Sequence, residues 1–181
     1  MQNTVTELPE IIDQHAFNLE RWEELCANES LAALDYRIET DELGQLIMSP
    51  PPAPEHGEYQ SEIAFFLRLH ANGQGHVITE CPISTTAGVK ASDVAWISVA
   101  RREEQRGAKA FTTAPEICVE VLSPSNTRNE IEEKKSLYFE SGALEVIICG
   151  LDGRIDFFLT DSPETPLKSN LCPEFPERIE L

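Results

Sequence analysis

Apolar residues in the first part of the chain are spaced as in a short helix followed by a β-hairpin. From residue 17 to residue 26 they recur at helical intervals, which predicts an amphipathic helix. Two short apolar stretches, 34–38 and 43–48, follow with the polar segment 39–42 between them, a pattern typical of a β-hairpin. The proline-rich segment 49–54 must be extended, because proline disfavours helix at the residue before it.

Two longer helices are expected in the rest of the chain. The first has apolar residues on one face from Tyr59 onwards and ends at Asn72-Gly73. The second, about 128–140, opens with the capping-box sequence Thr127-Arg-Asn-Glu130.

Strands are expected between and after these helices. Their predicted ranges are 76–84, 89–98, 116–122, 144–151 and 154–160. The proline-bearing segment after residue 160 is expected to wrap the surface. This order predicts the α/β class, with a mixed sheet flanked by helices and preceded by an N-terminal helix and a β-hairpin.

Length and composition are those of one globular domain. A chain of 181 residues with 41% hydrophobic residues can bury its own core, so we expect a single domain over 15–181 and an acidic, loosely ordered tail over 1–14. No apolar run approaches the roughly 20 residues of a membrane span, and the N-terminus does not resemble a secretory signal. The five cysteines form no CxxC pair, which disfavours a zinc site and favours a reducing compartment. We therefore expect a cytoplasmic protein without a membrane partner.

The formal net charge of −18 opposes binding to nucleic acid. Basic residues that neutralise phosphates supply most of the affinity of nucleic-acid-binding proteins. The segment 101–109, which we interpret as a loop, is mixed in sign and makes no basic patch. A nuclease of this charge needs a local basic patch, a divalent metal or an unusual substrate.

Charged residues interrupt three apolar patterns. Asp93 lies inside a predicted strand, and Glu120 lies inside the segment 117–122, which is apolar enough to be a central strand. A carboxylate buried there is costly unless it is paired or binds a cation. On the second predicted helix a lysine points toward the sheet, but helical spacing does not separate Lys134 from Lys135.

Two acids and a lysine within reach of each other suit metal-dependent cleavage of phosphodiesters. The acids hold a hard divalent cation through oxygen, and the cation activates water and neutralises the phosphate. The lysine orients the water or stabilises the developing charge. Taken alone, however, the pattern favours a purely structural ion-pair cluster, because such short constellations arise easily.

Four motifs follow one another in a fixed order along the chain. They are the hairpin with its Ser-Pro at 36–50, the segment Lys90–Trp96 around Asp93, the segment Pro115–Ser125 with Glu-Val-Leu-Ser-Pro-Ser, and Lys134-Lys-Ser-Leu-Tyr138 followed by Gly142. From about residue 15 to the C-terminus, the chain resembles the Uma-two family of restriction endonucleases in the PD-(D/E)XK superfamily. Ser92 stands where the family has proline, and Leu122 stands where the superfamily's E-x-K motif has lysine.

The resemblance implies a restriction-endonuclease-like fold and a DNA endonuclease that depends on Mg²⁺, with Mn²⁺ as its substitute. Asp93, Glu120 and Val121 are then the metal ligands. The K-x-x-x-Y register selects Lys134 as the catalytic lysine. DNA is the implied partner, and a homodimer is expected because nucleases that cut duplexes often pair two sites.

Two further residues and one alternative function stay open. Glu62, on the first long helix, is a candidate catalytic acid by resemblance, and a solvated helix flank explains it equally well. His56 is expected to cap the helix or lie on the surface rather than touch phosphate. The acidity favours the alternative function, a non-catalytic interaction or assembly protein on a nuclease-like scaffold.

Overall fold

The apolar strand segments form one six-stranded mixed sheet. The structure is a computed structural model that describes residues 11–34 and 36–181. The strands are, in chain order and in their order across the sheet, β3 (Gly75–Thr85), β4 (Gly88–Ser98), β5 (Ile117–Val121), β6 (Glu145–Cys149), β7 (Ile155–Leu159) and β8 (Ser162–Leu167). Neighbours are antiparallel except β5 and β6, which are parallel because helix α5 (Arg128–Glu140) connects them. The predicted class and mixed sheet are confirmed.

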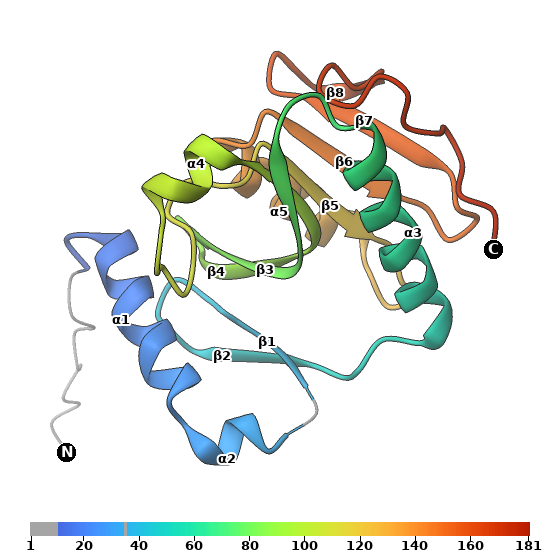
Figure 1. Cartoon of the computed structure of the whole chain (residues 1–181). Coiled ribbons are helices and arrows are strands. Elements are labelled where there is room, and N and C mark those ends of the chain that lie inside the picture. Colours follow the sequence, from blue (N-terminus) through green and yellow to red (C-terminus); the bar gives the residue numbers. More distant parts are fainter. Residues whose placement is uncertain (1–10, 35) are drawn as a thin grey trace, which may run out of the picture.

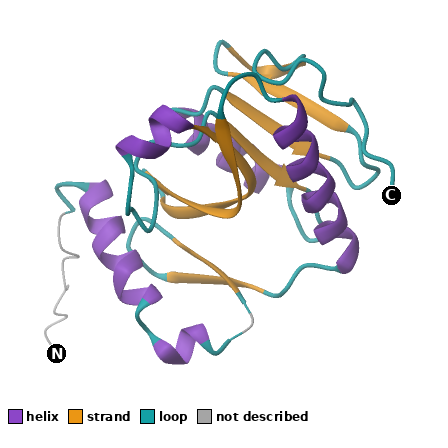
Figure 2. Ribbon diagram, viewed as in Figure 1, coloured by secondary structure: helices purple, strands orange, loops and turns teal. Residues whose placement is uncertain are grey.

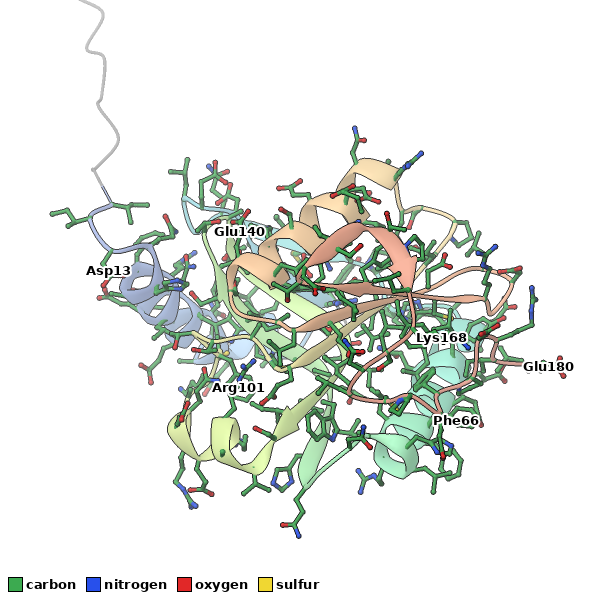
Figure 3. The ribbon with its side chains drawn as sticks, turned by 90° about the horizontal axis from the view of Figure 1, so that it is seen from above. Asp13, Phe66, Arg101, Glu140, Lys168 and Glu180 are labelled. Atoms are coloured by element: carbon green, nitrogen blue, oxygen red, sulfur yellow. The ribbon has the colours of Figure 1, made fainter. Side chains whose placement is uncertain are left out.

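One long helix covers each face of the sheet (Figure 1). Helix α3 (Pro54–His70) starts at a proline, which suits the first turn, and buries Ile63 and Leu67 in the apolar cluster on one face. Helix α5 buries Tyr138 in the cluster on the other face. In Figure 3, α5, which ends at the labelled Glu140, and α3, which carries the labelled Phe66, lie on opposite sides of the strands.

The N-terminal part forms a smaller unit of helix and hairpin beside this sheet (Figure 2). It consists of α1 (Gln14–Cys26), α2 (Glu29–Ala32), β1 (Arg37–Thr40) and β2 (Leu46–Ser49). Trp22 and Leu25 of α1 pack with Val89 of β4 in a third apolar cluster. The predicted N-terminal helix and hairpin are confirmed, and α2 is an addition to them.

The turn of the hairpin lies later than the sequence pattern indicated. The sequence pattern places Glu39 in the turn, but it belongs to strand β1. The Asp41 side chain accepts hydrogen bonds from the N–H groups of Leu43 and Gln45, and these bonds form the turn two residues further on. As a result, the charged side chains of Arg37 and Glu39 project from a strand rather than from a loop.

The predicted acidic tail lies mostly outside the described residues. Of the range 1–14, the structure describes only residues from 11 onwards, and α1 already begins at Gln14. Asp13 caps that helix by accepting a hydrogen bond from the Ala16 N–H group. Within the described ranges, every helix is too short or too polar to cross a membrane.

The β3–β4 hairpin is irregular where Glu80 faces Asp93. Ile78 and Cys81 both pack into the α5-side cluster, although residues three apart on a regular strand point to opposite faces. Glu80 lies between them with φ 51°, in the left-handed region that non-glycine residues rarely adopt. Strain of this kind concentrates at functional sites, and here it marks the part of the hairpin that carries Asp93.

Two predictions for the surface segments are wrong. Residues Val99–Glu104 form helix α4 rather than a loop, because the Ser98 hydroxyl accepts a hydrogen bond from Arg101 and caps its start. The C-terminal segment does not simply wrap the surface. It supplies edge strand β8, where prolines are tolerated, and it buries Phe175 and Ile179 in the α3-side cluster.

The C-terminal segment is held by a buried carboxylate at the start of β6. Glu145 is 1% exposed and accepts hydrogen bonds from Ser169 Oγ (2.5 Å) and from the N–H groups of Asn170 (2.7 Å) and Leu171 (2.8 Å). The position of Glu145 at the start of an apolar strand does not predict these hydrogen-bond partners from the sequence.

Replacing Glu145 should therefore release the C-terminal segment. Glu145→Ala leaves the buried Ser169 hydroxyl and two partly buried N–H groups without their acceptor, so we expect the free energy of unfolding to fall by about 3 kcal/mol in urea titrations. Glu164→Ala, on the exposed part of β8, serves as the control and should change it by less than about 0.5 kcal/mol. Equal effects of the two substitutions would contradict this role.

Candidate active site

A cavity of about 700 Å³ lies where the N-terminal hairpin, the start of α3, the middle of β4, the end of β5, and α5 meet. Asp93, Glu120 and Lys134 all line it, although they come from three elements and are up to 41 positions apart in sequence. The structure thus brings together the three residues that the sequence singled out. Val121 lines the same cavity.

Asp93 lies where strands β4 and β5 separate. Their backbone pairing ends at Val94 and Val119, and the Ser92 hydroxyl then accepts a hydrogen bond from the Val119 N–H group (3.0 Å). Further along, Asp93 Oδ2 accepts from the Val121 N–H group (2.6 Å), in the place of a backbone carbonyl. Side chains thereby replace the sheet pairing, and the Asp93 carboxylate is fixed beside the end of β5.

The second oxygen of Asp93 faces positive and polar groups. Arg37 Nη1 donates to Oδ1, and His56 Nε2 lies 3.5 Å from the same oxygen. Burial raises the pKa of Asp93, but the His56 imidazole, the Arg37 charge and the Val121 N–H group outweigh it and hold that pKa below its usual value. Asp93 is therefore a carboxylate at neutral pH.

Glu120 is held by two residues of α5 that lie one helical turn apart. Tyr138 Oη donates to Oε1 (2.5 Å), and Lys134 Nζ donates to Oε2 (3.2 Å). Positions i and i+4 share a helix face, which gives the Lys-x-x-x-Tyr spacing a physical reason. Burial nevertheless raises the pKa of Glu120 to about 7 against the Lys134 charge, and the Asp93 charge raises it further.

The structure separates the two lysines that helical spacing could not. Lys134 Nζ also lies 2.8 Å from Glu39 Oε1, so this ammonium group bridges two carboxylates inside the cavity. Burial lowers the pKa of Lys134, but the charges of Glu120 and Glu39 more than compensate and raise it. Lys135 points elsewhere, to Glu132 (2.6 Å) and over the ring of Phe158 (4.2 Å).

Three charged residues that join the ion pairs around Asp93 and Lys134 were not predicted from the sequence. Arg37 and Glu39 come from strand β1, and Glu80 comes from the irregular position in β3. Glu39 also accepts a hydrogen bond from the Ala91 N–H group (3.0 Å), so the hairpin is tied to β4. The charges of Arg37 and Glu39 on a short hairpin strand could have indicated them. Because the turn was predicted at 39–42, Glu39 was not recognised as part of that strand.

Two other predicted residues lie in contrasting places. Glu62 is exposed on α3 and does not line the cavity, so the structure does not bring it to Asp93 and Glu120. His56, in the first turn of α3, does line the cavity. Among the described residues, neither of its ring nitrogens has a hydrogen-bond partner.

The oxygen atoms of the cavity suit a hard divalent cation that needs few protein ligands. The described residues contain no group of three or more His, Cys, Asp or Glu side chains placed to hold a metal ion. Magnesium, however, is often held by one or two carboxylates and keeps several waters. Asp93, Glu120 and the backbone carbonyl of Val121 therefore fit Mg²⁺ chemically, and both carboxylates are now paired with the cations Arg37 and Lys134.

Comparison with known proteins agrees with this fold. A family model, Uma2, described as "Putative restriction endonuclease", matches residues 20–166. A solved structure from Anabaena variabilis ATCC 29413, described as a putative nuclease belonging to DUF820, superposes with a TM-score of 0.58 at 17% identity, over 71% of this chain and 73% of that chain. At this identity the likeness concerns the fold. No curated protein matches the chain.

Glu120→Gln should remove a pH dependence from the stability of the metal-free protein. The folded chain holds the Glu120 proton up to a pKa of about 7, whereas the unfolded chain releases it near the ordinary 4.5. This group therefore contributes stability below the lower value, and the contribution is lost as pH rises through the upper one, by up to about 3 kcal/mol.

Urea unfolding in the presence of EDTA tests this expectation between about pH 5 and about pH 8. Wild type should lose stability relative to Glu120→Gln as the pH rises. Glu164→Gln, with its exposed carboxylate, should follow wild type. Parallel curves for all three proteins would show that the Glu120 pKa is unshifted.

Proposed function

The chain belongs to the Uma2 family, and from this premise we propose that it is a metal-dependent DNA endonuclease acting through Asp93, Glu120 and Lys134. The observation that carries the proposal is the contact of Lys134 with Glu120 in the cavity that Asp93 also lines. Asp93 from β4, Glu120 from β5 and Lys134 from α5 form the set that such chemistry requires. The fold shared with a structure described as a "putative nuclease" supports it.

In this proposal Asp93, Glu120 and the Val121 carbonyl hold Mg²⁺ or Mn²⁺. A bound divalent cation supplies neutralisation of the scissile phosphate and a lowered pKa for water. Asp93 is suited to this role because the Val121 N–H group fixes its orientation. Tyr138 does the same for Glu120 from the opposite side.

Lys134 is the group that acts on the reacting atoms. Its ammonium is shared between Glu120 and Glu39, at 3.2 and 2.8 Å, and the neighbouring charges keep it protonated. If Glu120 bound a divalent cation, its contact with Lys134 would weaken. The Lys134 ammonium could then donate to a phosphate oxygen or to the attacking water. Glu39 keeps it positioned during that exchange.

Cleavage of plasmid DNA with and without Mg²⁺ or Mn²⁺ tests the proposal. Glu120→Gln and Lys134→Met should each lower the metal-dependent rate by at least about 100-fold, because each removes a group that acts on the transition state. Glu164→Gln and Lys168→Met change exposed residues outside the cavity and should match wild type. A background equal in wild type and Glu120→Gln would mean that the fold does not cleave DNA here.

One observation favours a second candidate, a non-catalytic interaction or assembly protein. The cavity is lined by eight acidic side chains and only three basic ones, Arg37, Lys90 and Lys134, and the whole chain carries −18. Such a surface repels DNA unless cations are bound. Calorimetric titration with Mn²⁺ separates the two candidates, since an assembly protein without a metal site shows no binding.

A homodimer and a cytoplasmic location belong to the same proposal. Paired sites suit an enzyme that cuts both strands of a duplex. All five cysteines are free, which agrees with a reducing compartment. Light scattering of the purified chain tests the dimer.

A further inference from the structure

Arg37 occupies the part of the cavity that a cation bound to Asp93 needs. Its guanidinium donates to Asp93 Oδ1 and to the Ala91 carbonyl, and its Nε lies 3.1 Å from Glu80 Oε2. Burial lowers the pKa of Arg37, but the charges of Asp93 and Glu120 outweigh this and raise it. The group is therefore a permanent positive charge at this position.

Each oxygen of Asp93 already faces a donor in this arrangement. Oδ2 accepts from the Val121 N–H group, and Oδ1 accepts from Arg37. The Val121 bond is part of the sheet and cannot be given up without separating β4 from β5 further. The arginine side chain, by contrast, comes from the small hairpin and is 20% exposed, so it is the partner that can move.

We propose that Arg37 is an internal cation that competes with the divalent metal for Asp93, so that metal binds only when the guanidinium turns aside. This inference rests on the proposed function, because it concerns the same metal site. It adds that the metal affinity of the chain is set by an arginine rather than by the carboxylates alone.

A second acceptor for the displaced guanidinium is already within reach. Glu80 Oε2 contacts Arg37 Nε at the open side of the cavity, where the Glu80 side chain is 46% exposed. The left-handed backbone of Glu80 (φ 51°) directs that side chain out of the regular strand alternation. Glu39 Oε1 lies 3.8 Å from Nη2 as well, so two carboxylates other than Asp93 are close to the guanidinium.

The exchange changes the charge that the cavity presents. Before the exchange, the Arg37 guanidinium is paired with the buried Asp93 carboxylate. After it, a bound metal neutralises Asp93, and the guanidinium faces the cavity with its donors available for an anion. An acidic chain would thus acquire a phosphate-binding group only in its metal-bound form.

Calorimetric titration of EDTA-stripped protein with Mn²⁺ tests the competition without any activity measurement. If Arg37 holds Asp93 in nine molecules of ten or more, Arg37→Gln should bind Mn²⁺ at least about tenfold more tightly than wild type, because the competent fraction then approaches one. Lys90→Gln removes a positive charge from the same cavity, where Lys90 donates to the Thr40 carbonyl and not to Asp93. Arg106→Gln removes one from the surface. Both controls should bind Mn²⁺ nearly as wild type does.

The outcomes distinguish this inference from the proposed function. Wild type that binds Mn²⁺ together with Arg37→Gln that binds it no more tightly overturns the competition alone. Failure of both proteins to bind Mn²⁺ overturns the competition and the metal-dependent nuclease together. An equal gain in Lys90→Gln would also overturn it, since net charge and not occupation of Asp93 would then be the cause.

A measurement on the wild-type chain covers the case in which Arg37→Gln does not fold, since it leaves the Asp93 carboxylate buried without its cation. The Nη–H signals of Arg37, which donate to Asp93 and Ala91 and are assigned by their loss in Arg37→Lys, are followed by NMR during titration with Mg²⁺. Displacement from Asp93 predicts faster exchange of these protons with water at saturation. A signal that exchanges equally slowly with and without Mg²⁺ overturns the proposal.

Discussion

Glu120 lies on a strand that is buried on both faces, and the cost of placing a carboxylate there governs the arrangement around it. A desolvated negative charge must be paired or proton-bound. Lys134 and Tyr138 meet one oxygen each from a single face of α5, which fixes the rotation of that helix over the sheet. Glu39 shares the same lysine, so the N-terminal hairpin is drawn to the same point. One buried carboxylate thereby ties β5, α5 and β1 together.

The cavity exists because two strands separate at this point. Backbone pairing of β4 with β5 stops at Val94, and Ser92 and Asp93 satisfy the N–H groups that would otherwise be unpaired. The Ser92 hydroxyl, at the position where the family that the sequence resembles has proline, replaces a backbone acceptor for the Val119 N–H group. Glu80, with its left-handed φ of 51°, lies on the neighbouring strand β3 at the same level. The residue that replaces the lost strand pairing, Asp93, is thus also a residue of the candidate site.

Positive charge inside the cavity is scarce. Arg37 is paired with Asp93, and Lys134 with Glu120 and Glu39, while the chain as a whole is strongly acidic. The third basic side chain of the lining, Lys90, donates to the Thr40 carbonyl. In the proposed function, a bound divalent cation would take over Asp93 and Glu120 and leave Arg37 and Lys134 available to a phosphate, which reconciles an acidic chain with nuclease chemistry.

The sequence alone was sufficient for the fold class, for the order of most helices and strands, and for picking out Asp93 and Glu120 as carboxylates inside strands, both of which line the cavity. Apolar periodicity is a local property, and a charge inside a buried strand is conspicuous in one dimension. Helical spacing in the sequence did not separate Lys134 from Lys135 as the lysine that points toward the sheet. Motif register favoured Lys134, and the contacts of that residue with Glu120 and Glu39 show which lysine lies in the cavity.

The tertiary structure decided what the local pattern could not contain. The edge strand β8 and the buried segment held by Glu145 depend on partners in distant parts of the chain. Glu62, plausible on its helix, faces solvent, whereas Arg37, Glu39 and Glu80 meet in the cavity from positions up to 43 residues apart. Burial and pairing of charges are properties of the assembled chain: a sequence states which residues would be costly to bury, and only the packing of the elements states which opposite charge meets them.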